Sequence, residues 1–567
     1  MVVGGVFMGR EVAIGIQNFD EIIENDCFYV DKTHFIKEWW DSRDSVTLIA
    51  RPRRFGKTLT MSMVEQFFSV EYAGRSDLFE GLNIWQEEEY RGIQGTYPVI
   101  SLSFANVKEK TYAETRQRIC RLLTAAYAKN RFLLESDVLT EQDKEFFLSV
   151  RPEMPEEMAA FCVHRLAEFL FKYYGKKVII LLDEYDTPMQ EAYVGGFWED
   201  LVSFTRGLFN ATFKTNPYLE RAIMTGITRV SKESIFSDLN HLEVVTTTAN
   251  KYAESFGFTE AEVFAAMDEF GYTDKDLIKK WYDGFVFGDK RDIYNPWSIL
   301  NFLDKGTVKT YWANTSSNSL AGKLIREGEP EIKTMMEDLM AGKVLHAQID
   351  EQIVYNRLDR SANAIWSLLL ACGYLKAVRY EFNLDRGKPE YDLALTNLEV
   401  RLMFEGMIES WFSDAVSAYN QFIKALLLCD VKAMNRYMNR VALETFSFFD
   451  TGKHASEYTE PERFYHGFVL GLLVDLKGRY VVSSNRESGF GRYDVILEPL
   501  KAEDKAYILE FKVYDPEDEA ALQDTVQAAL AQIEEKQYEA VLTAKGIAAE
   551  RIRKYGFAFE GKKVLIG

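Results

Sequence analysis

The sequence has few cysteines and histidines, and neither type is grouped. Five cysteines and six histidines occur among 567 residues. The cysteines are odd in number and form no CxxC pair, so we expect neither a zinc site nor a disulfide framework. Such a pattern is typical of reduced thiols in the core of a cytoplasmic protein. The cysteines are Cys27, Cys120, Cys162, Cys372 and Cys429.

Long apolar runs are lacking as well. No run approaches the roughly twenty residues that a membrane-spanning helix needs. The N-terminal segment is apolar but short, contains Arg10 and Glu11, and has no basic opening, so we do not expect a signal peptide. The chain is 47% hydrophobic and 567 residues long, which predicts about three globular domains and no membrane association.

Basic residues are fewer than acidic ones, 67 Lys and Arg against 87 Asp and Glu. The net charge is −20, and residues 451–567 contain 16 Lys and Arg against 20 Asp and Glu. Affinity for nucleic acid depends on neutralising phosphates, so we expect any such binding to be modest and salt-sensitive. A basic group near the C-terminus is either a phosphate-facing edge or a solvated helix face. Its members are Lys545, Arg551, Arg553, Lys554, Lys562 and Lys563.

Two apolar runs near the C-terminus carry carboxylates. The run RYDVIL (492–497) contains Asp494, and the run AYILEFKV (506–513) contains Glu510 and Lys512, which share a face if the run is a strand. Carboxylates on adjacent strands can hold a hard cation such as Mg²⁺, or Mn²⁺ in its place. A lysine beside that cation can assist an attacking water or stabilise charge on a phosphate, which indicates phosphodiester cleavage. An exposed Glu and Lys alternating with core residues fit the ExK spacing equally well.

The surrounding segments predict a helix, three strands, a second helix and a fourth strand. This order, with its D…ExK residues, resembles the core of the PD-(D/E)xK nuclease superfamily. Gln532 and Tyr538 resemble a Q…Y element that follows the ExK strand in some members, although two amphipathic helix-end residues explain them more simply. The expected segments are 462–476, 480–484, 492–497, 506–513, 516–536 and 538–543.

The resemblance implies roles for four residues of this region. Asp494, Glu510 and Lys512 correspond to the catalytic D…ExK residues. Glu462 corresponds to the acid of the first helix, and it joins Asp494 and Glu510 as a metal ligand.

A basic loop near the N-terminus lies between a strand-like run (45–50) and a run with helical spacing (59–68). The loop reads RPRRFGKT over 51–58. Strand, loop and helix are the context of a phosphate-binding P-loop, because backbone N–H groups and the helix N-terminus form an anion nest. The pattern GxxxxGK[ST] requires glycine where this chain has Arg51, so the loop need not have the ordinary P-loop geometry. Arg51, Arg53 and Arg54 can instead supply positive charge to the phosphates. A basic turn before a helix is the alternative.

Within the loop, Lys57 is expected to reach the β- and γ-phosphates of ATP, and Thr58 to ligate Mg²⁺. The other residues expected to contact the nucleotide are Arg53, Arg54, Phe55 and Gly56.

A buried acidic strand complements this loop. KKVIILLDEYDTP (176–188) resembles a Walker B segment, in which Asp183 holds Mg²⁺ and Glu184 polarises the attacking water. A third strand (221–229) places Thr225 where a sensor of the γ-phosphate would lie. An ordinary strand end explains Thr225 equally well.

The RPRRFGK run resembles the loop of an AAA-ATPase-like family. The segments FYHGFVLGLL, NRESGFGRYD and ILEFK resemble a branch of the PD-(D/E)xK superfamily that is fused behind such an ATPase-like domain. The expected fold is α/β: a P-loop NTPase-like parallel sheet followed by a small restriction-endonuclease-like domain. The expected domains are the ATPase-like domain (1–250), a helical lid with a winged-helix-like piece (251–400), a helical connector (401–450) and the nuclease-like domain (451–567).

The resulting hypothesis is a cytoplasmic ATPase whose nucleotide state controls a Mg²⁺-dependent nuclease. DNA or RNA is the expected partner, with self-association through the ATPase-like domain, and a role in defence or nucleic-acid processing follows by family analogy. The alternative is a nucleotide-switched signalling or scaffold protein whose nuclease-like domain binds nucleic acid without cutting it. The C-terminal site retains Glu462, Asp494, Glu510 and Lys512 together, which favours the nuclease over the non-cleaving alternative.

Overall fold

The computed structural model divides the chain into two units. The first is Met1–Ala321 with Val344–Met403, and the second is Gly322–Lys343 with Phe404–Gly567. The chain therefore passes from one unit to the other at three places. The structure describes residues 10–214, 216–229, 235–236, 239–312, 319–327, 330–350, 358, 362–383, 388–413, 416–445, 469, 473, 476, 479–488, 491–516, 518–561 and 563–567.

A five-stranded sheet forms the centre of the first unit. Its order is β2-β3-β4-β1-β5, and all neighbouring strands are parallel, as expected from the sequence. β1 and β3 are buried along their whole length, because helices cover both faces of the sheet and uninterrupted apolar runs can face them. The strands are β1 Val46–Ala50, β2 Val99–Ser103, β3 Val178–Asp183, β4 Leu219–Gly226 and β5 Leu242–Val245.

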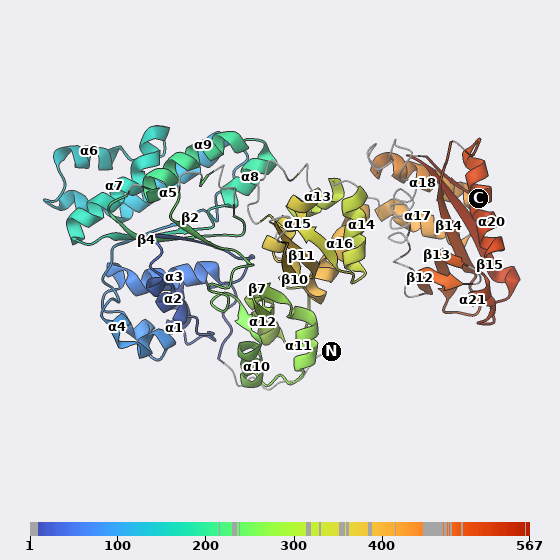
Figure 1. Ribbon diagram of the computed structural model, residues 1–567, viewed down its shortest axis with the longest axis horizontal. Helices are drawn as coiled ribbons and strands as arrows, with labels where there is room; N and C mark the ends of the chain where they lie inside the picture. The colour runs from blue at the N-terminus through green and yellow to red at the C-terminus, as the bar shows by residue number, and fades with distance from the viewer. Residues whose placement is uncertain are drawn as a thin grey trace. The chain divides into compact units, whose positions relative to one another are not determined.

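Helices lie on both faces of this sheet. Figure 1 shows α1 to α4 on one face and α5, α7 and α9 on the other. Between β2 and β3 the chain forms α5, α6 and α7. The helices are α1 Phe19–Glu24, α2 His34–Ser42, α3 Lys57–Phe68, α4 Glu88–Arg91, α5 Tyr112–Lys129, α6 Glu141–Ser149, α7 Glu156–Tyr174, α8 Thr187–Gly195 and α9 Trp198–Phe209.

The rest of the first unit combines short helices with two small antiparallel sheets, β6-β8-β7 and β10-β11-β9. The sequence around α12 specifies its ends: Asn295 caps the first turn, Pro296 follows at the first position, and Gly306 takes a φ of 62° after the last. The elements are β6 Phe258–Thr259, α10 Glu260–Glu269, α11 Lys275–Tyr282, β7 Phe285–Phe287, β8 Lys290–Tyr294, α12 Pro296–Lys305, β9 Leu345–Gln348, α15 Ala362–Ala371, β10 Leu375–Asn383 and β11 Lys388–Leu395. The helix α16 Leu398–Ser413 begins in the first unit and passes into the second after Met403.

A mixed five-stranded sheet of order β12-β13-β14-β15-β16 organises the second unit. β14 and β15 are parallel and the other neighbours are antiparallel. The elements are α13 Ser319–Glu327, α14 Pro330–Met340, α17 Val416–Leu427, α18 Val431–Thr445, β12 Tyr480–Ser488, β13 Gly491–Pro499, β14 Ala506–Val513, α20 Leu522–Glu535, α21 Ala540–Thr543, β15 Ile552–Glu560 and β16 Lys563–Ile566.

The fourth strand of this unit is not where the sequence predicts it. The YEAVLT segment contains the short helix α21, and the strand parallel to β14 is β15. The prediction of a strand at 538–543 is therefore wrong, because tertiary pairing with β14 selects a later segment over one with strand-like composition.

Two asparagines of α18 cover the edge of this sheet. The Asn439 side chain donates to the Val564 carbonyl (2.6 Å) and accepts from the Val564 N–H (3.0 Å). Asn435, one turn earlier, exchanges the same two bonds with Ile566, at 2.8 Å each. The outward backbone groups of β16 are thus satisfied by side-chain amides.

Within the part of the chain that the structure describes, no helix has the length and apolar character needed to cross a membrane.

Candidate functional site

The N-terminal candidate site lies at the carboxyl ends of three neighbouring strands, β3, β4 and β1. The loop 51–56 follows β1, Asp183 ends β3, and Thr225 lies at the end of β4. Parallel sheets bind ligands at this edge, where the loops after the strands meet. The fold therefore brings the loop and the acidic strand end together around β4.

Arg51 is not directed into this loop's cradle. Its side chain is fully buried and donates to the carbonyls of Val245 (3.5 Å), Lys251 (3.2 Å) and Thr246. The guanidinium also lies 4.6 Å from the Phe287 ring centre, and burial lowers the pKa of Arg51. The residue that replaces the first glycine of the P-loop pattern thus anchors the loop to the segment that follows β5.

The second half of the loop has the geometry of an anion nest. Arg54 and Gly56 have φ of 64° and 82°, and α3 begins at Lys57 with its free N–H groups facing the loop. The Lys57 ammonium is buried and donates to the carbonyls of Arg51 (3.0 Å) and Pro52 (2.8 Å). Burial lowers the pKa of Lys57, and the nearby Glu184 and Asp183 oppose that shift.

Thr58, Asp183 and Thr225 form one hydrogen-bonded group. The Thr58 hydroxyl donates to Asp183 Oδ2 at 2.8 Å, and the Thr225 hydroxyl donates to Asp183 Oδ1. Asp183 is 4% exposed, and burial raises its pKa despite these two donors. A hydroxyl and a buried carboxylate beside a phosphate nest are the ligands that a nucleotide-bound Mg²⁺ takes, so the donor set fits that ion.

The residues after β3 connect this group to its surroundings. Glu184 has a φ of 51°, and its N–H donates to the Thr225 hydroxyl (3.2 Å). Asp186 is 1% exposed and accepts from the N–H groups of Ile227 (3.0 Å) and Thr228 (2.9 Å), which fixes the turn after β4. Glu184 is therefore presented from a constrained turn beside Asp183.

The C-terminal candidate site lies on one face of the second unit's sheet. Tyr507, Leu509 and Phe511 of β14 pack into one apolar cluster, whereas Ile508 packs into the cluster on the opposite face, where α20 lies. Because side chains alternate along a strand, Glu510 and Lys512 share the face of Ile508. On β13, Asp494 shares the face of Ile496, which belongs to the same cluster as Ile508.

The two carboxylates meet where the β13–β14 ladder ends. The pairing stops at Val495–Leu509. Beyond it, Asp494 Oδ2 accepts from the Phe511 N–H at 2.8 Å, and the Asp494 N–H donates to Glu510 Oε2 at 3.4 Å. Glu510 is 3% exposed. Two oxygen-bearing side chains held together in this way suit Mg²⁺ or Mn²⁺.

Two residues from the following helical segment complete the site. The Gln532 amide of α20 donates to Glu510 Oε1 and to the Tyr538 hydroxyl (3.2 Å). Burial raises the pKa of Tyr538, and the Glu510 and Asp494 charges add to that effect. α20 approaches β15 so closely that a side chain at Gly556, the register partner of Glu510, would lie 2.7 Å from the Val526 carbonyl.

Lys512 is partly exposed on the shared face, and Glu462 lies outside the described residues. The site that the structure describes therefore consists of Asp494, Glu510, Lys512, Gln532 and Tyr538.

The basic residues near the C-terminus are engaged with groups of their own unit. Lys545 pairs with Glu498 (2.5 Å), and Lys554 pairs with Glu534 (2.8 Å). The remaining described members bond as follows: Arg551 to the Asp504 carbonyl, Arg553 to the Glu550 carbonyl at 2.7 Å and Lys563 to Glu560 at 3.1 Å. The three lysines are thus paired with carboxylates, whereas Arg551 and Arg553 bond to neutral carbonyls and keep their net charge.

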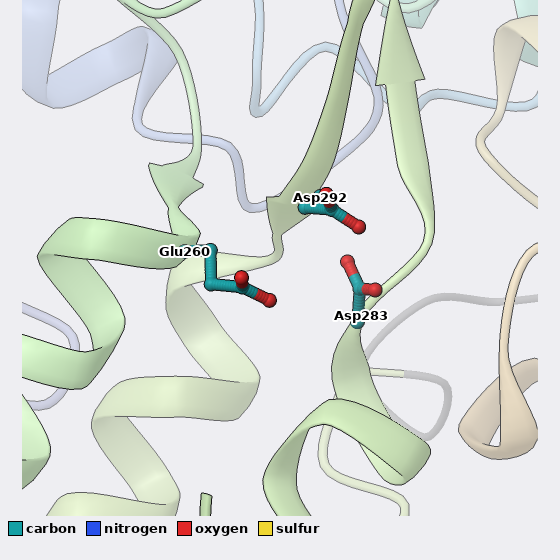
Figure 2. Close-up of side chains that lie close together, drawn as sticks. All are labelled: Glu260, Asp283 and Asp292. Atoms are coloured by element: carbon teal, nitrogen blue, oxygen red, sulfur yellow. The ribbon is translucent and has the colours of Figure 1, made fainter. Parts of the chain in front are cut away.

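A group of three acids lies apart from both sites. Figure 2 shows Glu260 of α10, Asp283 and Asp292 of β8, whose carboxylate oxygens lie within 4.8 Å of one another. Lys279 pairs with Glu260 and lies 3.7 Å from Asp292. Burial and the neighbouring Asp292 raise the pKa of Asp283 to about 6. The group is an ion-paired cluster within the first unit.

Two segments of the chain match known protein families. Residues 13–236 match the family described as predicted AAA-ATPase, and residues 460–567 match the PD-(D/E)XK nuclease superfamily. The chain thus carries an AAA-ATPase-like domain and, at its C-terminus, a domain of the PD-(D/E)XK nuclease superfamily, which confirms the resemblance seen in the sequence. A protein of Azotobacter chroococcum mcd 1, described as "Uncharacterized protein in vnfD 5'region", is 25% identical over 512 residues, covering 89% of this chain and 90% of that protein.

Proposed function

We propose that this protein binds and hydrolyses ATP at its N-terminal site and cleaves nucleic acid at its C-terminal site, with nucleotide state controlling cleavage. The observation that carries the proposal is the convergence of Asp494 and Glu510 on the face of the sheet that also bears Lys512. This D…ExK set lies within a segment that matches a nuclease superfamily.

At the C-terminal site, Asp494 and Glu510 would hold Mg²⁺ or Mn²⁺, together with Glu462. A bound cation of this kind lowers the pKa of its water and neutralises charge on the scissile phosphate. Lys512 would place its ammonium beside the same phosphate and stabilise the charge that develops there. Gln532 fixes the orientation of Glu510, as groups behind metal ligands commonly do.

At the N-terminal site, Lys57 would exchange the loop carbonyls for the β- and γ-phosphates. Thr58 and Asp183 would hold Mg²⁺, and Glu184 would orient the attacking water. The other expected nucleotide contacts are Arg53, Arg54, Phe55, Gly56 and Thr225.

Control of cleavage requires that ATP bind two arrangements of the protein with different affinity. Support for such a link comes from the division of the chain, because residues 322–343 belong to the second unit although the chain on both sides of them belongs to the first. A change in the first unit thus acts on three covalent connections to the second.

The test uses the purified full chain with labelled single- and double-stranded DNA and RNA, with and without ATP, Mg²⁺ and Mn²⁺. Residues acting as one unit are non-additive, so Asp494→Ala, Glu510→Ala and the double variant should fall to a similar low rate. Lys512→Ala should lose cleavage and keep metal binding, because an ammonium is not a ligand. Glu503→Ala, an exposed acid between β13 and β14, serves as the matched control and should cut normally.

Two results would count against the proposal. Binding of nucleic acid without metal-dependent cutting of any of the four substrates would favour the non-cleaving alternative. Equal cutting rates with no nucleotide, ADP and a non-hydrolysable ATP analogue would show that the two sites work independently.

A further inference from the structure

The front half of the phosphate loop is held by residues that are remote in sequence. The Arg53 carbonyl accepts from Asn295 Nδ2 (3.3 Å) and from Trp312 Nε1 (3.0 Å). Both donors belong to side chains that are 1% exposed. Two buried donors therefore converge on one backbone oxygen of the loop.

Neighbouring loop residues have partners from the same region. Pro52 lies against Gly373, where an added Cβ would come within 2.8 Å of the proline ring. The Arg54 guanidinium lies 4.3 Å from the ring centre of Trp297. The Phe55 ring packs edge-on against Phe285 and Phe287, at centroid distances of 4.8 and 5.3 Å.

The buried carboxylate of Glu399 links the segments that carry the two donors, Asn295 and Trp312. Glu399 is fully buried. Its carboxylate accepts from the backbone N–H of Trp312 (2.7 Å) and from the Ser298 hydroxyl of α12 (2.8 Å). Asn295 in turn caps α12, because its Oδ1 accepts from Trp297 N (2.9 Å). Asn295 and Trp312 are thus both connected to the start of α12.

This support matters because the loop lacks the glycine that normally lets a P-loop adopt its phosphate-binding shape. The Lys57 ammonium donates to the carbonyls of Arg51 and Pro52, the two residues before Arg53. Displacing the Arg53 carbonyl would shift those carbonyls and the N–H groups of the nest together. The loop's shape therefore depends on contacts supplied from outside it.

We propose that Asn295 and Trp312 are positioning residues of the nucleotide site: by holding the Arg53 carbonyl they set the loop in its phosphate-binding conformation. This inference rests on the proposed ATP binding. Because coupling between binding and conformation is reciprocal, bound ATP should in turn tighten the contact of residues 295–312 with the loop.

The test compares two conservative variants in the full chain by calorimetry with MgATP. Trp312→Phe keeps a ring but removes Nε1, and Asn295→Ser keeps an oxygen to cap α12 but removes the Nδ2 donor without adding charge. Loss of one such hydrogen bond should weaken ATP binding about five- to tenfold in each. The KM for ATP should rise by a similar factor while kcat changes little, since neither residue touches the reacting atoms.

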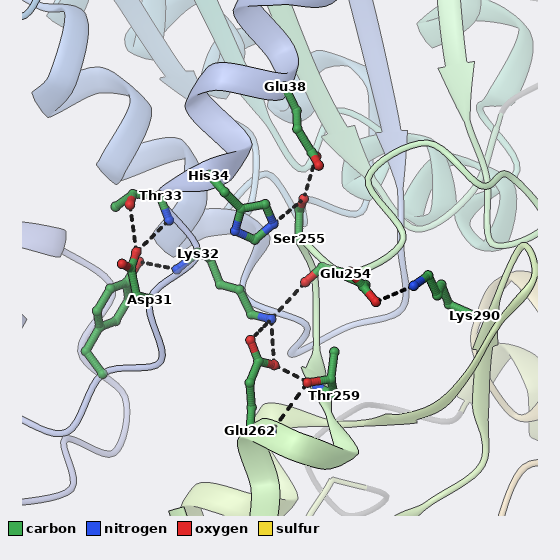
Figure 3. Close-up of polar contacts among 11 residues, drawn as sticks. Asp31, Lys32, Thr33, His34, Glu38, Glu254, Ser255, Thr259, Glu262 and Lys290 are labelled. Atoms are coloured by element: carbon green, nitrogen blue, oxygen red, sulfur yellow. Dashed lines mark hydrogen bonds and ion pairs between the residues drawn. The ribbon is translucent and has the colours of Figure 1, made fainter. Parts of the chain in front are cut away.

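Lys32→Met provides the matched control, because it breaks another buried contact, between Lys32 and residues 254–262, that includes no residue of the phosphate loop. Figure 3 shows the Lys32 ammonium bonded to the Glu262 carboxylate (2.7 Å) and to the Glu254 carbonyl (2.8 Å). This variant should lower the thermal midpoint and leave ATP affinity unchanged. Hydrogen exchange over 295–312 should slow with MgATP in the wild type and less so in the two variants.

The outcomes separate this inference from the proposed function. No ATP binding by the wild type would overturn the proposed function itself. Normal ATP affinity in both Trp312→Phe and Asn295→Ser, beside a wild type that binds ATP, would overturn the positioning role alone. An equal loss of affinity in Lys32→Met would do the same, because the effect would then reflect general attachment of this region.

Discussion

Gln532 offers a quantitative test of the C-terminal site. Its amide is the donor to Glu510 Oε1, so Gln532→Leu removes that hydrogen bond and conserves most of the side-chain volume. A hydrogen bond to a charged group contributes about 1.5–3 kcal/mol. At ~1.4 kcal/mol per factor of ten, kcat/KM for cleavage should fall about 10- to 150-fold.

The same substitution should act through the metal ion. Without the Gln532 donor, Oε1 of Glu510 loses this hydrogen bond, and loss of a group behind a metal ligand typically lowers metal affinity about 10- to 100-fold. Raising Mg²⁺ should therefore recover part of the activity. Tyr538→Phe removes the acceptor for the second amide proton and leaves the Gln532 bond to Glu510 in place, so its effect should be smaller, about three- to tenfold.

The assay is a steady-state cleavage measurement over a range of Mg²⁺ concentrations, using whichever nucleic acid the wild type cuts best. Gln527→Leu is the matched control, because Gln527 is exposed on the same helix. The reasoning fails if Gln532→Leu changes kcat/KM by less than threefold, or if Gln527→Leu lowers it equally.

Three further predictions concern the nucleotide site and stability. Lys57→Ala should weaken ATP binding at least about 100-fold by calorimetry, whereas Glu184→Gln should bind normally and turn over slowly, since only Glu184 is expected at the attacking water; equal affinity of Lys57→Ala and wild type would refute the P-loop assignment. Asp283 has a folded pKa of about 6 against an ordinary value of 3.8, so the folded protein loses stability as pH rises from about 4 to 6. Asp283→Asn should therefore raise the thermal midpoint more at pH 7.5 than at pH 4.5, with a stability gain of about 1–3 kcal/mol at the higher pH, and a gain independent of pH would contradict this. Asn439→Ala leaves the buried Val564 N–H and carbonyl without these partners and should cost about 2–4 kcal/mol in urea unfolding of the second unit; an unchanged midpoint would show that water replaces the amide.

The sequence predicts those parts of the protein that depend on local patterns. The parallel sheet follows from uninterrupted apolar runs such as β3, and the shared face of Glu510 and Lys512 follows from their spacing along one strand. Asp494 lies beside them because β13 is the neighbour of β14 in the sheet. The resemblance to the PD-(D/E)xK superfamily predicts that strand order.

Long-range contacts account for what the sequence does not predict. The role of Arg51 depends on carbonyls about 200 residues away, at 245–251, which no local pattern indicates. The Gln532–Tyr538 pair has a recognisable spacing, yet only the approach of α20 to β14 gives it a partner in Glu510. The strand at 552–560 is chosen by its pairing with β14, which composition does not show.

The amide cover of β16 also limits what the second unit can assemble with. Unpaired edges of β-sheets are templates on which further chains polymerise or swap strands. Here Asn435 and Asn439 imitate a neighbouring strand's donors and acceptors from a helix, so an incoming strand would have to displace four hydrogen bonds before it could form its own. Growth of the sheet at β16 is therefore disfavoured.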